Sequence, residues 1–289
     1  MEDLLREADS DRFRALNVPT EAQYLALWRE HAERQSDLVS MALAGGLYAD
    51  RLAWVFIAGY QAAIRCTFPG AELSGWAAFA VSEDRQPDNP LPGVTVQGAP
   101  QSQVLNGHKT WVAAAEHIDQ LIVKAGRGGD AQYFALDRAE PGLELSVRPA
   151  AGFLSELSQG AAHLNGVRVA EPQLLDASQV PLFGIREALF IYAAFCAFVL
   201  ARSPDSTRRE RSRSLAREVP SLLASRFSAS AELSALKQFD ADVQELLDDI
   251  DNEAENNTGG NTFPLSANWP RDRRLISMYS KGIQARRAT

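Results

Sequence analysis

The sequence predicts an α+β protein in which a small β domain lies between two helical regions. Apolar residues recur at helical spacing near both ends of the chain, whereas the middle consists of short β-rich runs separated by turn residues. We therefore expect N-terminal helices over residues 1–75, a central antiparallel β-barrel or sandwich over residues 76–178, and a C-terminal helical bundle over residues 179–289.

The N-terminal region combines two helical patterns. Residues 21–31 have the apolar period of an amphipathic helix. Residues 45–65 are apolar nearly all round, which is typical of a helix buried between neighbours. The run TFPGAELSG at residues 67–75 is rich in proline and glycine, so we expect the helical region to end there.

The central region contains evenly spaced β-rich runs. They are WAAFAVSE, VTVQG, SQVLNGHKTWV, QLIVKAG, QYFALD, LELSVRP and AHLNGVRV, with Gly, Pro, Asn or Asp between them. This pattern is typical of an antiparallel sandwich or barrel. The run AGRGGD at residues 125–130 lies between two of these strands. We therefore expect a hairpin turn there and not a dinucleotide-binding loop, which would open a helix.

The C-terminal region is helical again. An apolar helix is expected around residues 185–202, followed by an arginine-rich segment and a final helix at residues 271–287. Between them, residues 239–256 read FDADVQELLDDIDNEAEN and place four apolar residues on one helical face: Val243, Leu246, Leu247 and Ile250. We expect a helix with one buried stripe and a solvated acidic face. An EF-hand fits the segment poorly, because the turn glycine and the closing glutamate are missing.

The charge and the apolar pattern argue against several classes of partner. The formal net charge is −8, so we expect no nucleic-acid partner, which would need a broadly basic face. The longest apolar run, residues 188–201, is shorter than the roughly 20 residues that a membrane helix needs. The start MEDLLREADSDRF is charged throughout, so no signal peptide is expected. These features predict a soluble, cytoplasmic protein without a membrane span.

Motifs of several common chemistries are absent from the sequence. There is no HExxH, paired CxxC, GxSxG or GxxxxGK[ST] motif. The two cysteines, Cys66 and Cys196, stand in apolar runs and are expected to be reduced core thiols. We expect no metal site, because ligand spacing is lacking among the four histidines: His31, His108, His117 and His163.

Three segments carry motifs in a fixed order. Residues 105–126 read LNGHKTWVAAAEHIDQLIVKAG, residues 161–175 read AAHLNGVRVAEPQLL, and residues 271–287 read RDRRLISMYSKGIQARR. In turn they resemble the acyl-CoA dehydrogenase motifs xNGxKxWITNAxxADxxxVxA, xxVxFxxVRVPxxNLL and RDxxxxxIYEGTxxIxR. FAVSE at residues 79–83 stands where that family carries xALTEPxAGSD. The resemblance covers residues 45–289.

The resemblance implies a flavin-linked oxidoreductase. In this family FAD lies between the β domain and the C-terminal bundle. A glutamate removes the α-proton of an acyl thioester while a hydride leaves the β-carbon for the flavin. We therefore expect FAD as cofactor, acyl-CoA or another acyl thioester as substrate, and a role in fatty acid metabolism. The resemblance also implies a dimer or tetramer, or a hetero-oligomer with a catalytic paralogue.

The resemblance assigns two groups of site residues. The cofactor-binding group comprises Ser82, Trp111, Val112 and Ala113. The substrate-pocket group comprises Tyr279, Ser280 and Gly282. In the first group Ala113 replaces a threonine whose hydroxyl contacts the flavin ring. Residues 82–89 also lack the glycine-bearing turn of the family, which would allow the backbone to approach a ligand closely.

Both positions of the catalytic base depart from the family pattern. Ser280 replaces the catalytic glutamate, and a serine hydroxyl is no base near neutral pH without a partner. Other family members carry the base on the first C-terminal helix, just before an arginine. Ile185, before Arg186, stands at that position. Glu187 is two residues further, about 200° around the helix, so we expect it on the opposite face.

These departures leave three interpretations open. The chain keeps the fold for binding or assembly, with dehydrogenase activity impaired or lost. Alternatively, it is an active flavoenzyme with no general base or with a relocated one, for which Glu83, Asp84 and Glu187 are the candidates. A third interpretation, a nucleic-acid role through the arginine-rich segment, is disfavoured by the net charge.

Overall fold

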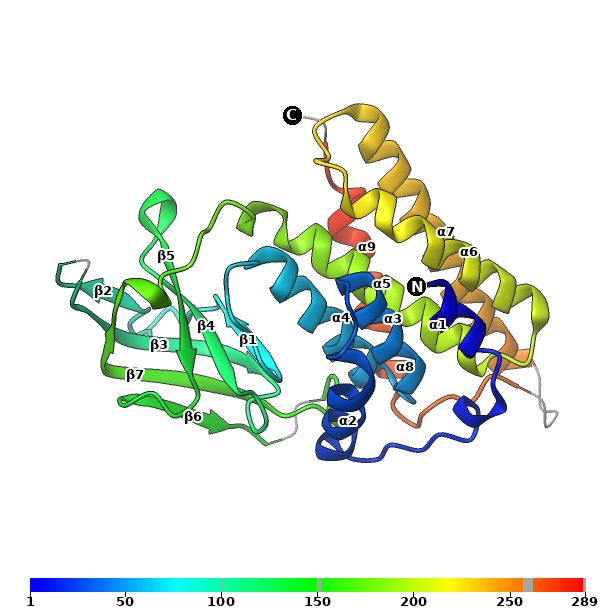
Figure 1. The fold of residues 1–289 in the computed structure, drawn as a ribbon, viewed down its shortest axis with the longest axis horizontal. Coiled ribbons are helices and arrows are strands. Elements are labelled where there is room, and N and C mark those ends of the chain that lie inside the picture. Colours follow the sequence, from blue (N-terminus) through cyan, green and yellow to red (C-terminus); the bar gives the residue numbers. More distant parts are fainter. Residues whose placement is uncertain (100, 150–151, 257–261, 288–289) are drawn as a thin grey trace. The chain divides into compact units, whose positions relative to one another are not determined.

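The chain divides into two compact units. The computed structural model describes residues 1–99, 101–149, 152–256 and 262–287. A helical unit comprises Met1–Ala63 and Gly184–Thr289, and a β unit comprises Ile64–Phe183. In Figure 1 the blue start and the yellow-to-red end of the chain lie together in the helical unit. The three domains expected from the sequence stay a prediction.

The helical unit takes its helices from both ends of the chain. In the described residues they are α1 (Glu2–Glu7), α2 (Glu21–Leu27), α3 (Leu38–Tyr48), α4 (Leu52–Thr67), α5 (Phe183–Arg202), α6 (Ser206–Leu223), α7 (Ser230–Asn256), α8 (Trp269–Asp272) and α9 (Arg274–Gln284). Asp37 caps α3 by accepting the Ser40 N–H, and Asp205 caps α6 by accepting the Arg208 N–H. Such caps satisfy N–H groups that lack a partner within the helix.

Helix α5 forms the centre of the helical unit. All its residues from Ala188 to Arg202 are buried. Two glycines, Gly46 of α3 and Gly59 of α4, allow the neighbouring helices to approach its backbone closely. By length and composition the stretch Val180–Arg202 could cross a membrane, but 72% of its apolar window is buried within the fold. This burial is what a core helix requires.

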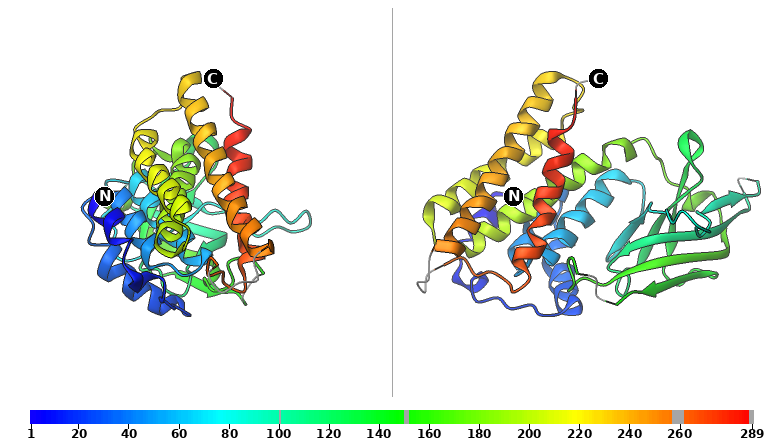
Figure 2. Two further views of the ribbon diagram at one scale, coloured as in Figure 1. Left: turned by 90° about the vertical axis from the view of Figure 1, so that its right-hand side faces the viewer. Right: turned by 180° about the vertical axis from the view of Figure 1, so that it is seen from behind.

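The predicted buried stripe of the acidic segment is confirmed. It lies in α7, which buries the predicted stripe of Val243, Leu246, Leu247 and Ile250. Figure 2 shows α7 (orange) beside α9 (red). The two helices run next to each other because the buried stripe of α7 and the apolar residues Leu275, Ile276 and Ile283 of α9 share the core.

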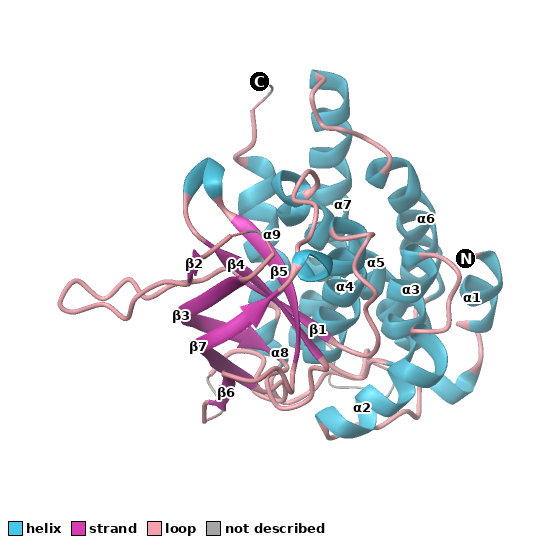
Figure 3. Ribbon diagram, turned by 60° about the vertical axis from the view of Figure 1, so that its left-hand side comes forward, coloured by secondary structure: helices cyan, strands magenta, loops and turns pink. Residues whose placement is uncertain are grey.

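The β unit contains two separate sheets, shown in magenta in Figure 3. The described strands are β1 (Ala77–Ala80), β2 (Thr95–Gln97), β3 (Gln103–Ala113), β4 (Gln120–Ala125), β5 (Gln132–Asp137), β6 (Leu143–Val147) and β7 (Gln159–Val169). One sheet has the order β1-β4-β5 and the other β2-β3-β7-β6. The predicted α+β class is therefore correct, but these strands do not close into a barrel.

One strand pair differs from the antiparallel prediction. β1 runs parallel to β4, with Ala77 opposite Gln120 and Ala80 opposite Val123. A parallel pair needs a long crossover, and the segment between these strands, which contains β2 and β3, supplies it. The sequence does not reveal the parallel pairing, because short β-rich runs separated by turn residues are compatible with parallel and with antiparallel strands.

The prediction for AGRGGD is confirmed. β4 and β5 are antiparallel, with Ala125 opposite Gln132, so the glycines between them belong to a hairpin connection. Gly126 and Gly128 adopt φ angles of +79° and +60°, a region that favours glycine. No helix of the dinucleotide-binding kind follows them.

Candidate functional site

Ser280 lies in a hydrogen-bond network inside the helical unit. It is on α9, and its hydroxyl donates to Asp240 Oδ2 on α7 at 2.7 Å. The same oxygen accepts from Gln284 Nε2 at 2.7 Å, and Asp240 Oδ1 accepts from the Tyr192 hydroxyl at 2.6 Å. The Asp240 carboxylate therefore joins α5, α7 and α9.

The sequence pattern predicts that Asp240 lies on the solvated acidic face of its helix, but its side chain is fully buried. A buried carboxylate is costly unless several hydrogen bonds compensate it, and three donors from neighbouring helices do so here. A signal was present in the sequence. Asp240 precedes Val243 by three residues and Leu247 by seven, so it lies on the same helical face as the buried stripe.

Glu187 and Tyr279 form a second pair in the helical unit. The Tyr279 hydroxyl and the Glu187 carboxyl are hydrogen-bonded. Burial raises the pKa of Glu187 from its ordinary value of 4.5 to about 7, although the bond from Tyr279 opposes this change. Burial also raises the pKa of Tyr279. The nearby charge of Glu187 raises it further and is the second-largest cause. The pair brings a carboxyl group with near-neutral pKa next to the residue that precedes Ser280.

The alternative base position does not offer a titratable group. Ile185 is buried, with 1% of its side chain exposed. Glu187 is on the same helix, is half-buried and is hydrogen-bonded to Tyr279. Of the substrate-pocket residues predicted from the sequence, Tyr279 and Ser280 take part in these networks, and Gly282 is exposed on α9.

In the β unit, Ser82 and Trp111 line the same pocket of about 480 Å³. Other side chains of its wall are charged: Glu83, Asp84, Arg85 and Arg148. The remaining two predicted cofactor residues lie differently. Val112 and Ala113 are buried and pair with Gly160 and Gln159 of β7. The structure thus unites Ser82 with Trp111 but directs the side chains of Val112 and Ala113 into the core.

Glu83 is held by a buried lysine. Lys109 is fully buried, and its Nζ lies 2.8 Å from Glu83 Oε1. Burial lowers the pKa of Lys109, and the hydrogen bond that Lys109 donates to Glu83 partly opposes this change. The carboxylate also packs against Gly93, where a Cβ would lie 2.5 Å from it. A paired and enclosed Glu83 is a poor candidate for a relocated base.

Asp84 closes the loop that replaces the family's glycine-bearing turn. Its two carboxylate oxygens accept from the Gln86 and Leu91 backbone N–H groups, each at 3.0 Å. Backbone hydrogen bonds, that from Leu91 foremost, lower the pKa of Asp84. A carboxylate stabilised in this way is also a poor base. Burial raises the pKa of Glu187, which makes it a better candidate than Asp84.

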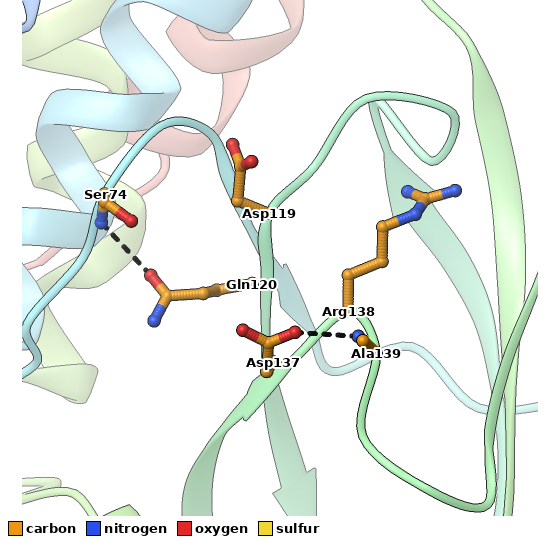
Figure 4. A pocket seen from close by; sticks show the side chains of 6 residues that line it. All are labelled: Ser74, Asp119, Gln120, Asp137, Arg138 and Ala139. Atoms are coloured by element: carbon orange, nitrogen blue, oxygen red, sulfur yellow. Dashed lines mark hydrogen bonds between the residues drawn. The ribbon is translucent and has the colours of Figure 1, made fainter.

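A second pocket of the β unit, shown in Figure 4, lies at the ends of β4 and β5. Its polar groups bind the backbone of neighbouring segments. Gln120 Oε1 accepts from the Ser74 N–H at 3.2 Å, and Asp137 Oδ1 accepts from the Ala139 N–H at 2.8 Å. Arg138 donates to the Ala115 carbonyl at 2.7 Å. We interpret this pocket as a structural junction between chain segments.

The histidines and the arginine-rich segment have structural partners. His108 stacks on His163 of β7, with ring centroids 4.4 Å apart, and not on His117. In the part of the chain that is described, no group of three or more His, Cys, Asp or Glu could hold a metal ion. Arg208 binds Asp249 and Glu253 of α7, and Arg217 binds Glu2 of α1. These ion pairs give arginines of the segment carboxylate partners within the helical unit.

Solved structures resemble the whole chain. A structure described as an FAD-dependent dehydrogenase matches with a TM-score of 0.61 and 14% identity, over 98% of this chain and 91% of that one. The apo form of PigA matches with a TM-score of 0.59 and 15% identity, over 99% and 98% of the two chains. The prolyl acyl carrier protein oxidase AnaB has a TM-score of 0.55 and 15% identity, over 98% and 92%.

These matches confirm the predicted acyl-CoA dehydrogenase-like fold. No protein-family model matches the sequence, and no curated protein does either. The likeness is therefore one of three-dimensional arrangement, retained at low sequence identity.

Proposed function

We propose that this chain is an acyl-CoA dehydrogenase-like flavoprotein that binds FAD and an acyl thioester, with its dehydrogenase activity impaired or lost. The observation that carries the proposal is the hydrogen bond from Ser280 to the buried Asp240. Position 280, where the family's glutamate would stand, holds a hydroxyl that already donates its proton. General-base catalysis needs a group that accepts a proton from the substrate, and Ser280 alone cannot do so.

The pocket of the β unit offers groups that fit part of FAD. Trp111 provides an aromatic surface of the kind on which a flat ring stacks, and Arg85 and Arg148 carry the charge that phosphates require. The loop at Ser82 lacks the glycine-bearing turn of the family. Side chains of this loop would therefore make the contacts to FAD that backbone groups make in other family members. When bound, FAD would supply the acceptor for a hydride from the acyl chain.

The substrate class rests on the acyl-CoA dehydrogenase-like fold. One structural neighbour is a prolyl acyl carrier protein oxidase, whose name denotes an acyl thioester on a carrier protein. Acyl-CoA and acyl carrier protein thioesters share the same reacting group, and both belong to the proposal. A dimeric or tetrameric state, a catalytic paralogue as partner, a cytoplasmic location and a place in fatty acid metabolism are further parts of it.

The absorption spectrum tests the cofactor part of the proposal. The purified protein is mixed with excess FAD, desalted and scanned in the visible range. We expect a retained flavin band and a weaker one in a W111A variant. An acyl-CoA added without oxygen should then leave the band largely unbleached. A colourless protein after desalting would contradict FAD binding, and rapid bleaching would contradict the loss of activity.

A second candidate function is an active oxidoreductase in which Glu187 is the relocated base. Its pKa of about 7 suits a general base near neutral pH, and Tyr279 positions it by a hydrogen bond. The carboxylate would take the α-proton of the thioester. In that case acyl-CoA bleaches the flavin of the wild type and of S280A, and the E187Q variant does not bleach. Bleaching by E187Q at the wild-type rate would eliminate this candidate.

A further inference from the structure

We infer that Asp240 makes Ser280 a hydrogen-bond acceptor towards the ligand, so that the site selects acyl thioesters that carry an N–H or O–H donor near the reacting carbons. This inference deepens the proposed function and rests on it, because it presumes that an acyl thioester binds beside α9. It assigns a specificity role to Ser280 and a positioning role to Asp240.

The direction of the hydrogen bond follows from the chemistry of the two groups. A carboxylate accepts hydrogen bonds and has no proton to donate, whereas a serine hydroxyl has one proton and two lone pairs. The distance of 2.7 Å between Ser280 Oγ and Asp240 Oδ2 therefore means that Ser280 donates its proton to Asp240. The oxygen of Ser280 is left with lone pairs, which bind donors and repel acceptors.

The network keeps this orientation in place. Asp240 is fully buried, and Tyr192 and Gln284 also donate to it. Turning the Ser280 hydroxyl away would remove one of three donors from a buried charge, which is more costly than losing an ordinary hydrogen bond. Ser280 itself is only partly buried and Gln284 is exposed, whereas Asp240 and Tyr192 are fully buried, so the α9 side of the network is the side that another molecule can reach.

The same geometry accounts for the absence of glutamate at position 280. A glutamate at position 280 would bring a second carboxylate towards the buried Asp240, and two like charges so close together repel each other. Asp240 and a glutamate at position 280 are therefore alternatives. This chain has the carboxylate on α7 and a neutral hydroxyl on α9.

The ligand preference can be measured with matched thioesters. The FAD-treated full chain is titrated by calorimetry with α-hydroxybutyryl-CoA and β-hydroxybutyryl-CoA, and with the O-methyl ether of each. The ethers keep the oxygen and lose the donor. We expect at least one hydroxyacyl thioester to bind about three- to tenfold more tightly than its ether, the usual range for one hydrogen bond.

Three variants separate selection from general damage. S280A should abolish the preference, and S280T, which keeps the hydroxyl, should retain it. D240N should abolish or reverse it, because an asparagine amide can donate to Ser280 Oγ and so free the serine proton for an acceptor. Y192F removes the hydrogen bond to the other carboxylate oxygen of Asp240, Oδ1, and should leave the ligand preference intact.

The outcomes distinguish this inference from the proposed function. If the wild type binds the hydroxyacyl thioesters and their ethers equally, or if D240N and S280A keep the preference, the inference is overturned and thioester binding stands. If no acyl-CoA binds at all, the proposed function fails and the inference fails with it.

Discussion

Lys109 and Glu83 form an ion pair whose two members are buried to different degrees. The Lys109 side chain is fully buried, whereas 22% of the Glu83 side chain is exposed. We expect E83Q to lower the free energy of unfolding by about 3–5 kcal/mol, since it leaves a buried ammonium without its counter-charge. K109M should cost less, because the remaining carboxylate can reach water. Urea unfolding measures both.

The double variant is the control for this pair. An E83L/K109M protein removes both charges and should be more stable than E83Q, because no uncompensated charge remains in the interior. If E83Q and K109M lower stability equally, the asymmetric burial of the two side chains does not govern the energetics.

Glu187 should make stability depend on pH in an unusual direction. Its pKa is about 7 in the folded chain and about 4.5 in the unfolded chain, so the folded state binds more protons between these values. The wild type therefore loses stability as pH rises through this window. The loss relative to E187Q is at most about 3 kcal/mol, and smaller because the side chain is only partly buried.

Unfolding curves of the wild type and E187Q at several pH values test this expectation. The two proteins should differ least at acid pH, where the wild-type carboxyl is protonated, and E187Q should gain relative to the wild type towards alkaline pH. A constant difference at all pH values would show that Glu187 titrates alike in both states.

At the scale of elements, α6 and α7 are joined by ion pairs of unequal burial. Arg208 is 5% exposed and binds both Asp249 and Glu253, whereas Arg211 is 32% exposed and binds Glu245. R208M should cost about 2–4 kcal/mol, because it leaves the partly buried Glu253 without its main partner. R211M should cost less than about 1 kcal/mol and even less in high salt. Equal losses would contradict this ranking.

At the scale of the whole molecule, the helical unit must bring together the two ends of the chain. Gly59 of α4 packs on α5 so tightly that a Cβ would lie 2.5 Å from the Ile191 backbone. G59A should therefore separate the helices and cost at least about 1–3 kcal/mol. Gly282 of α9 has open space around it, so G282A is the matched control and should be neutral or slightly stabilising.

Thermal melting followed by far-UV circular dichroism measures the two glycine variants. A large loss for G59A together with an unchanged G282A would show that the contact between distant chain segments limits the stability of the helical unit. A neutral G59A would mean that α4 and α5 can move apart without cost.

The class of the fold and the order of its parts can be predicted from the amino-acid sequence. Periods of the apolar residues marked the helices and strands, and the turn glycines in AGRGGD marked a hairpin. These signals are local, since they depend on the conformation that neighbouring residues prefer and on which face is buried. The motifs around Trp111 and Ser280 added the acyl-CoA dehydrogenase-like fold, which the structural matches confirm.

The pairing of the polar residues, in contrast, depends on how the folded chain packs. Ser280 and Asp240 are 40 residues apart in the sequence, and Arg208 and Asp249 are 41 residues apart. No local sequence pattern predicts either pair. The same holds for Tyr279 with Glu187 and for the parallel pairing of β1 with β4. Such contacts arise from the packing of whole helices and strands, and the burial that sets the pKa of Glu187 and the role of Asp240 exists only after that packing.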